Sequence, residues 1–267
     1  MHRLLAVARA YTLGMLTYRT RTLVSLITVL VAVVPVYFVA GALQPLAAKA
    51  IASESTEYFT YLVVGSVASF VVAEAVSAIP SLINSYITSG TLEQLLTTPI
   101  RWPSLLGGLS AYGFGWVALR ALALLVTAWV WATSTIAWPR MLEFTIIMAL
   151  LATAYVGIGL IAGALVLSIR SSLFIPQAAG TLSALLGTVY FPASVLPSAF
   201  APFAVLVPTT PALRAARQVL LRDQSLGALL PDLLQLVGWA VAGVVIGGVT
   251  FHAALQHARR AGTLTQY

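Results

Sequence analysis

The sequence contains no cysteine and only one lysine, and each absence excludes a class of site. Without cysteine there is no disulfide, no thiolate metal site and no cysteine nucleophile, and the redox compartment stays undetermined. The single lysine is Lys49, and Ala48 precedes it, whereas a phosphate-cradling loop ends in Gly-Lys-Ser or Gly-Lys-Thr. The chain therefore cannot bind ATP through a loop of that kind.

Charge is also scarce. Only 8% of the 267 residues are charged and 60% are hydrophobic, whereas a soluble domain carries about 25% charged residues. Charge-free runs cover residues 22–48, 144–169, 171–213 and 233–258. Each run exceeds the roughly 20 residues that a helix needs to cross a hydrocarbon layer of about 30 Å. The sequence therefore predicts an all-α polytopic membrane protein.

The net charge of +7 does not indicate nucleic acid as a partner. Thirteen of the fourteen basic residues are arginines scattered among apolar segments, and no dense basic block occurs. Such a distribution is typical of residues that set membrane orientation.

We expect one transmembrane domain over residues 1–267. Its six spans are predicted at residues 22–43, 60–86, 105–134, 144–167, 174–190 and 233–255. Residues 1–21 predict an amphipathic interfacial helix, because Leu4, Val7 and Tyr11 recur at helical spacing beside several arginines. The alternative for this segment is a helical extension of the first span.

The run 171–213 is too long for one span and is rich in proline. Its prolines are Pro176, Pro192, Pro197, Pro202, Pro208 and Pro211. Proline interrupts a helix, and interrupted backbone at membrane depth must be shielded by protein or water. We therefore predict a span that ends near Tyr190, followed by an external re-entrant helical hairpin at residues 191–221.

The basic residues favour an orientation with both termini in the cytoplasm. The predicted inner side then holds Arg3, Arg9, Arg19, Arg21, Arg101, Arg170, Arg259 and Arg260. The predicted outer side holds Lys49, Arg140, Arg214, Arg217 and Arg222. Eight basic residues inside against five outside follow the positive-inside rule, although the last three outer arginines oppose it.

The connection between the second and third predicted spans carries signals for a short helix. Gly90 ends one helix, Thr91 caps the next, Glu93 lies in its first turn and Pro99 stops it. Its apolar face consists of Leu92, Leu95 and Leu96. The segment is either an ordinary connector or a rigid peg that docks on a cytoplasmic partner.

Two ionisable residues, Glu74 and Arg120, lie well inside predicted spans. A lone charge there costs from about 3 to more than 10 kcal/mol, so the two residues are expected to pair. A structural ion pair and a role facing the transport pathway both remain open. The glycine pairs Gly159–Gly163 and Gly243–Gly247 are interpreted as sites of close helix packing.

The segment Gly90-Thr-Leu-Glu-Gln-Leu-Leu-Thr-Thr-Pro99 resembles the coupling-helix signature of the type-2 ABC exporter permease family. Residues 190–197, continuing to Pro211, resemble the family's outward-facing hairpin, and residues 258–264 resemble its basic cytoplasmic tail. The family often has charged residues before the Gly-Thr pair, whereas this chain has Ile87, Thr88 and Ser89. This difference leaves the electrostatics of the docking contact open.

The resemblance implies a permease subunit of an ATP-driven exporter in the cell inner membrane. Two nucleotide-binding ATPase subunits would hold ATP and Mg²⁺, a second identical or homologous permease would complete the pathway, and this chain would bind no cofactor and catalyse no reaction itself. The substrate would be an amphipathic compound, a lipid or a glycan. The ATPase-coupling residues would be Thr91, Leu92, Glu93, Gln94, Leu95, Leu96 and Pro99.

Other functions predict other features. A secondary transporter or channel would use the Glu74/Arg120 pair, but that class usually has several membrane carboxylates or two broken helices in repeats. An intramembrane enzyme would need clustered acids, histidines or a nucleophile–base pair. A membrane scaffold gives no reason for a capped peg between Gly90 and Pro99.

Overall fold

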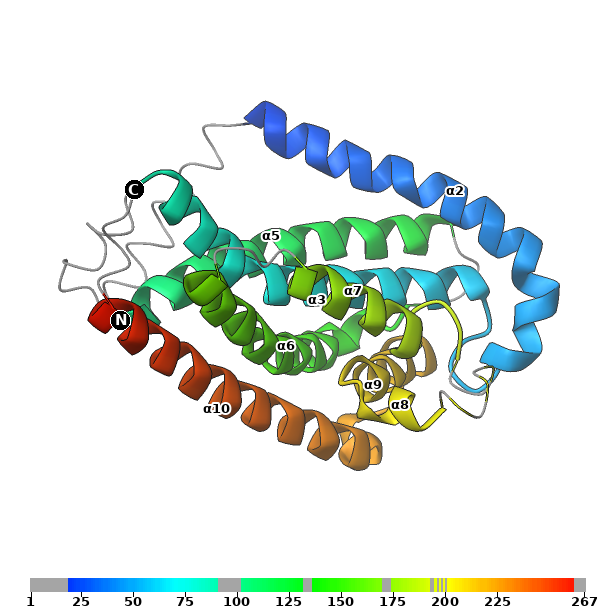
Figure 1. The fold of residues 1–267 in the computed structure, drawn as a ribbon. Helices are drawn as coiled ribbons and strands as arrows, with labels where there is room; N and C mark the ends of the chain where they lie inside the picture. Colours follow the sequence, from blue (N-terminus) through cyan, green and yellow to red (C-terminus); the bar gives the residue numbers. More distant parts are fainter. Residues whose placement is uncertain are drawn as a thin grey trace.

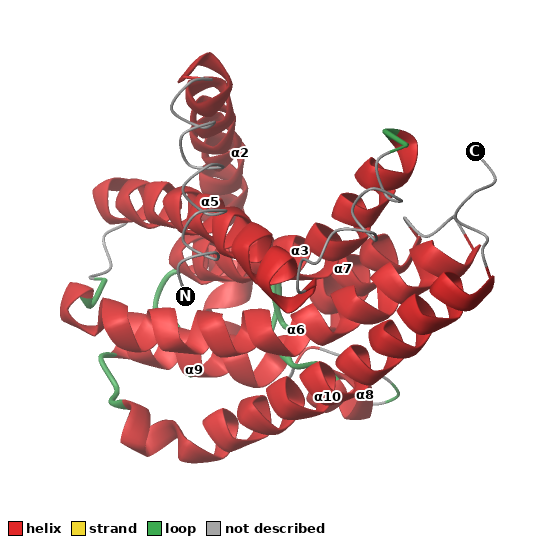
Figure 2. Ribbon diagram, turned by 90° about the vertical axis from the view of Figure 1, so that its left-hand side faces the viewer, coloured by secondary structure: helices red, strands yellow, loops and turns green. Residues whose placement is uncertain are grey.

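The computed structural model describes residues 19–90, 102–131, 136–169, 174–192 and 201–261, with residues 195, 197 and 199 between the last two ranges. These residues form helices and contain no strand (Figures 1 and 2). The predicted all-α architecture is therefore confirmed. Helical structure is expected here, because every backbone N–H in a membrane must find its hydrogen-bond partner within the protein.

The helices follow one another along the chain with short connections. They are α2 (Arg19–Ile51), α3 (Tyr58–Thr88), α5 (Trp102–Trp131), the 3₁₀ helix η1 (Trp138–Arg140), α6 (Met141–Ile169), α7 (Phe174–Leu186), α8 (Ala201–Leu206), α9 (Thr209–Arg222), the 3₁₀ helix η3 (Leu226–Leu229) and α10 (Leu230–Ala261).

Five helical segments of the described chain are long and apolar enough to cross a membrane. They are Val33–Ile51, Tyr58–Thr88, Gly113–Trp131, Trp138–Ser168 and Leu226–His257. In place of the fifth predicted span, at residues 174–190, the structure has α7 with 13 residues. At about 1.5 Å per residue, α7 is some 20 Å long and shorter than the hydrocarbon layer. It ends early because the chain turns at Gly187 and at Thr188, which has a φ of 59°.

The helix α3 lies in the middle of the bundle and contacts α2, α5, α6, α7 and α9. Its side chains are buried on several sides, and Val64, Val67 and Ala68 are almost fully enclosed. The helix α2 lies at the edge, where it contacts α3 and α5 and leaves most of its surface exposed (Figures 1 and 2). Of the first predicted segment, residues 1–18 lie outside the described residues, and Arg19–Arg21 belong to α2.

Glycines allow α6 and α10 to approach with their backbones in contact. A Cβ atom at Gly243 would lie 2.6 Å from the Ala154 carbonyl oxygen, and one at Gly247 would collide with the backbone of Gly157. Gly159 packs in the same way against the Ala75 carbonyl oxygen of α3. The two predicted glycine pairs therefore serve packing within this chain, as small residues do between membrane helices.

The connections gather at two ends of the bundle (Figure 1). The end that holds the α2–α3 connection, η1, α8, α9 and η3 is called the α9 end. The other end holds the last residues of α3 and α10 and the start of α5, and is called the Gly90 end.

Candidate functional sites

The predicted hairpin region contains two helices, α8 and α9, separated by Val207 and Pro208. Pro208 lies at the N-cap of α9, where a missing N–H costs no helical hydrogen bond. Pro211 lies in the first turn of α9 and is buried, as is Pro192 before α8. Pro197 and Pro202 are exposed. The prolines thus mark the breaks between short helices that sequence analysis predicted for this region.

The helix α9 runs beside the first half of α6. At one end of α9, the Ala137 N–H, just before α6, donates a hydrogen bond to the Leu220 carbonyl oxygen at 2.9 Å. At the other end, the hydroxyls of Tyr155 and Thr209 are hydrogen-bonded at 2.8 Å. Tyr155 lies midway along α6, so the first residue of α9 reaches the middle of that helix.

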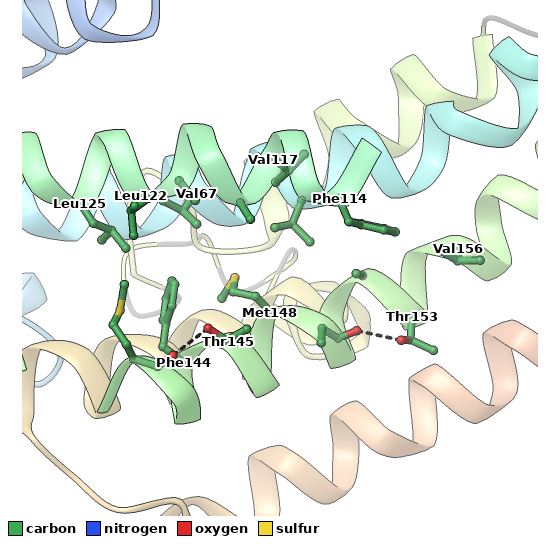
Figure 3. Close-up of a pocket in the computed structure, with 16 residues that line it drawn as sticks. Val67, Phe114, Val117, Leu122, Leu125, Phe144, Thr145, Met148, Thr153 and Val156 are labelled. Atoms are coloured by element: carbon green, nitrogen blue, oxygen red, sulfur yellow. Dashed lines mark hydrogen bonds between the residues drawn. The ribbon is translucent and has the colours of Figure 1, made fainter. Parts of the chain in front are cut away.

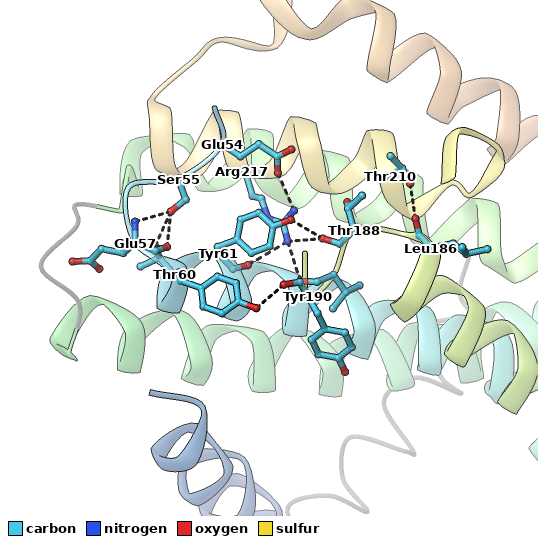
Figure 4. A network of polar contacts seen from close by, with 12 residues as sticks. Glu54, Ser55, Glu57, Thr60, Tyr61, Leu186, Thr188, Tyr190, Thr210 and Arg217 are labelled. Carbon is cyan, nitrogen blue, oxygen red and sulfur yellow. Dashed lines mark hydrogen bonds and ion pairs between the residues drawn. The ribbon is translucent and has the colours of Figure 1, made fainter. Parts of the chain in front are cut away.

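Arg217 of α9 is the largest fully buried side chain of the described residues. Its guanidinium donates to the Glu54 carboxylate at 2.9 Å and to three carbonyl oxygens, those of Thr188 at 3.0 Å, Val189 at 3.2 Å and Tyr61 at 3.3 Å (Figure 4). It also stacks 3.3 Å above the centre of the Tyr61 ring. One side chain thereby joins α9, the α2–α3 connection, the start of α3 and the turn after α7.

Burial lowers the pKa of Arg217, because removal from water disfavours the charged form. Tyr61 and the nearby Glu54 carboxylate oppose this shift. A buried charge that is both paired and hydrogen-bonded can be kept in the fold, whereas an unpaired one is strongly destabilising.

Further ion pairs fasten α9 to the neighbouring elements. Arg140 of η1 bonds to Glu143 at 2.9 Å and also to Asp223, which follows α9. Arg214 bonds to Asp232 of α10 at 3.2 Å. The α9 end is therefore a network of paired charges rather than a basic patch.

The arginines that oppose the positive-inside rule in the predicted orientation have partners in the structure. Arg214 and Arg217 each have an acidic partner, and Arg222 donates to the Ala52 carbonyl oxygen. Arg217 was not among the site residues predicted from the sequence, where it figured only as one of the outer basic charges. A signal was present: Leu213 and Leu220, four positions before and three after Arg217, place it on the apolar face of the helix.

The structure describes both residues of the predicted pair, Glu74 and Arg120. They lie on the adjacent helices α3 and α5, and Arg120 acts electrostatically on the Glu74 carboxyl group. That carboxyl group lies against Gly113 of α5, where a Cβ atom would collide with it. The Arg120 guanidinium is also 5.1 Å from the centre of the Trp116 ring. The geometry allows either a structural or a transport role.

A mostly apolar cavity of about 460 Å³ lies between α3, α5 and α6 (Figure 3). Val67, Phe114 and Phe144 are among its lining residues. Its two threonines, Thr145 and Thr153, bond to carbonyl oxygens of their own helix, so they offer it little polarity (Figure 3). The cavity is suited to hydrocarbon. Among the described residues, no three His, Asp or Glu side chains are grouped as a metal site would require.

The predicted coupling segment lies mainly outside the described residues. This applies to Thr91, Leu92, Glu93, Gln94, Leu95, Leu96 and Pro99. Its first boundary is described: α3 ends at Thr88, Ser89 is the C-cap, and Gly90 has a φ of 67°. The prediction that Gly90 ends a helix is therefore confirmed, because a left-handed residue after the C-cap favours glycine. In the sequence the segment lies between α3 and α5.

Comparison of the sequence with known protein families found a match to one family. The family model described as ABC-2 type transporter matches residues 3–221, which extend from before α2 to the last turn of α9. No curated protein matches the chain. The matched range includes the predicted coupling segment, Glu74, Arg120 and the Arg217 network.

Proposed function

The chain belongs to the ABC-2 type transporter family, and from that premise we propose that it forms the translocation pathway of an ATP-driven exporter. The family assignment makes the chain a multi-pass permease subunit of an ABC transporter, which associates with ATP-binding subunits. The family match over residues 3–221 is the observation that carries the proposal.

In the proposed complex, two nucleotide-binding subunits hold ATP and Mg²⁺, and a second permease, identical or homologous, completes the pathway. The complex lies in the cell inner membrane with both permease termini in the cytoplasm. Neither nucleotide nor Mg²⁺ binds to this chain. The substrate class that we propose is an amphipathic compound, a lipid or a glycan, which agrees with the apolar cavity between α3, α5 and α6.

The route of coupling that we propose starts at the segment between Gly90 and Trp102. Thr91, Glu93 and their neighbours contact the ATPase, and closure of the ATPase subunits on ATP displaces this segment. Because the segment joins α3 to α5, both helices move with it. The start of α3 is bonded to α9 through the Tyr61 carbonyl oxygen and Arg217, which supports transmission to the opposite end.

Co-purification tests the proposal. The tagged chain is isolated from its native membrane in mild detergent, and the eluate is assayed for an ATPase subunit and for vanadate-sensitive ATP hydrolysis. We expect a stoichiometric ATPase that is lost in the double variant Glu93→Ala, Leu95→Ala. The control variant Gln224→Ala changes an exposed residue at the α9 end and should retain the ATPase. Pure permease without any ATPase would contradict the proposal and favour a secondary transporter.

A further inference from the structure

A second cavity, of about 410 Å³, lies at the α9 end between α2, the start of α3 and the end of α5. Its volume falls within the range of about 300–1,000 Å³ that is usual for small-molecule sites. It has no residue in common with the Arg217 network or with the cavity between α3, α5 and α6.

Aromatic rings from three helices line this cavity. Tyr37 of α2 lies between Phe59 of α3, at 5.1 Å between ring centres, and Trp131 of α5, at 5.4 Å. Phe38 of α2 is 5.8 Å from Tyr37. The planes of these three rings make angles of 75–86° with the plane of the Tyr37 ring. The contacts are therefore edge-to-face and not stacked. Aromatic faces are electron-rich and attract cations.

The cavity has one charged residue among those that line it, Glu57. The backbone of Glu57 is held in place: its carbonyl oxygen accepts hydrogen bonds from Ser55 Oγ at 2.8 Å and Thr60 Oγ1 at 3.0 Å, and its N–H donates to Ser55 Oγ at 3.2 Å. Its carboxylate points away from Arg217 (Figure 4). The Glu57 side chain therefore lies outside the Arg217 network, and Glu57 is one of the residues that line the cavity.

Gln44 of α2 also lines the cavity, and two hydrogen bonds hold its side chain. Its Oε1 accepts from the Tyr58 N–H at 2.6 Å and its Nε2 donates to the Thr56 carbonyl oxygen at 3.0 Å. These two bonds tie α2 to the start of α3, on either side of Glu57. The cavity is consequently bounded by residues that are held by hydrogen bonds and ring contacts before any ligand enters.

We propose that this cavity binds an organic ammonium cation, with the charged nitrogen against the faces of Tyr37 and Trp131 and near the Glu57 carboxylate. Aromatic rings beside a carboxylate suit a bulky, weakly hydrated cation. A bare metal ion would instead need several oxygen ligands, which the rings do not supply. The proposal uses neither the segment between Gly90 and Trp102 nor the Arg217 network, so its failure would leave the permease assignment unaffected.

An organic ammonium group could reach the cavity in two forms, as the trimethylammonium headgroup of a choline lipid or as a free amphipathic cation. The cavity lies at the α9 end and includes the exposed side chain of Phe38 among its lining residues, so both sources can reach it from the surface. The probe for the site itself is choline, and its matched neutral analogue is 3,3-dimethyl-1-butanol, which has the same shape with carbon in place of nitrogen.

Binding of radiolabelled choline is measured by equilibrium dialysis on the full chain, with any subunits that co-purify, in phosphatidylglycerol nanodiscs. We expect the neutral analogue to compete at least about tenfold more weakly than choline, because only the cation interacts with the rings and the carboxylate. Trp131→Leu and Glu57→Gln should each weaken choline binding about fivefold or more. Trp129→Leu is the matched control, since Trp129 lies two residues away on α5, is 56% exposed and does not line the cavity.

Tyr37→Leu replaces Trp131→Leu if that variant fails to fold. Tyr37→Phe, which keeps the ring, should bind choline as the unmodified chain does.

Repeating the measurement in phosphatidylcholine nanodiscs separates the two forms of the ligand. Loss of choline binding there supports a lipid headgroup as the occupant, and unchanged binding supports a free cation. Equal competition by the neutral analogue, equal effects of Trp131→Leu and Trp129→Leu, or no choline binding in phosphatidylglycerol would each overturn the proposal.

Discussion

At the scale of single residues, Arg217 is the side chain with the greatest consequence for the described structure. It brings a full charge into a place without solvent contact, where it has a carboxylate, three carbonyl oxygens and an aromatic face as partners. The carbonyl oxygens of Thr188 and Val189 belong to the turn after α7, which leaves them without helical partners. Arg217 therefore stabilises an irregular segment that would otherwise bury polar backbone.

Replacing Arg217 by Gln should destabilise the protein strongly. The variant leaves Glu54 without its ionic partner and removes the charged donor from the carbonyl oxygens, of which that of Thr188 keeps the Tyr61 hydroxyl at 3.0 Å. The loss of one member of a buried pair costs about 3–5 kcal/mol. Arg214→Gln is the control, because Arg214 lies one turn earlier on α9 with its side chain 46% exposed, and an exposed pair contributes about 0–1 kcal/mol. Thermal unfolding in detergent measures both. Similar melting temperatures for the two variants would contradict the role given to Arg217.

Glu74 requires a test that separates a structural role from a transport role. If the carboxylate is structural, Glu74→Gln should lower the yield of folded protein, measured by size-exclusion chromatography. Gly113→Ala should do the same, because its Cβ would displace the carboxylate, whereas Gly115→Ala, with nothing within 4 Å, should behave normally. Normal yield of Glu74→Gln with loss of transport would instead show that Glu74 serves the pathway.

At the scale of elements, the closest helix contact depends on the absence of side chains. Along α6 and α10, Gly157, Gly243 and Gly247 place backbone against backbone. Apolar burial gives little drive for association inside a membrane, so such contacts depend on van der Waals packing. The alternation of glycine with large apolar residues on α10 therefore determines which face of α10 meets α6.

Two adjacent glycines of α10 provide a direct comparison. Gly247→Ala should destabilise the α6–α10 contact by about 1–3 kcal/mol, because its Cβ meets the Gly157 backbone and one helix must shift. Gly248→Ala adds the same methyl group where nothing lies within 4 Å, so it should be neutral. Thermal unfolding of the two variants checks the difference. A melting temperature of Gly247→Ala that matches that of Gly248→Ala would refute the contact.

At the scale of the whole molecule, the two ends differ in how their charges are arranged. Within the described residues, the α9 end contains four ion pairs, formed by Arg140, Arg214 and Arg217 with acidic partners. Pairing lowers the contribution of these arginines to the net charge of this end. The positive-inside rule then applies to the remaining basic residues, which agrees with the proposal that the α9 end faces outward.

The absence of cysteine allows this orientation to be tested without background labelling. Single cysteines are introduced at exposed positions of opposite ends, as Gln224→Cys and Ser89→Cys. A membrane-impermeant maleimide applied to intact cells should label Gln224→Cys alone, and Ser89→Cys should react only after the cells are opened. The reverse pattern would place the Gly90 end outside and refute cytoplasmic termini.

Local signals in the sequence were sufficient to predict the class of the protein and several positions where its helices end. Long charge-free runs predicted membrane helices, prolines predicted the short helices near residues 191–221, and Gly90 predicted the end of α3, because each signal depends only on neighbouring residues. The sequence did not determine that α7 stops at Leu186, since the turn at Thr188 is stabilised by Arg217 from another helix.

The partners of the polar and aromatic residues became known only from the tertiary structure. Arg217 and Glu54 are 163 positions apart, and the rings of Tyr37, Phe59 and Trp131 come from three helices. No local pattern specifies such partners, because the free energy of a buried charge or a ring cluster depends on which distant surfaces the packed helices bring together. Composition places the chain in a membrane, and the packing of its helices decides what each polar side chain meets.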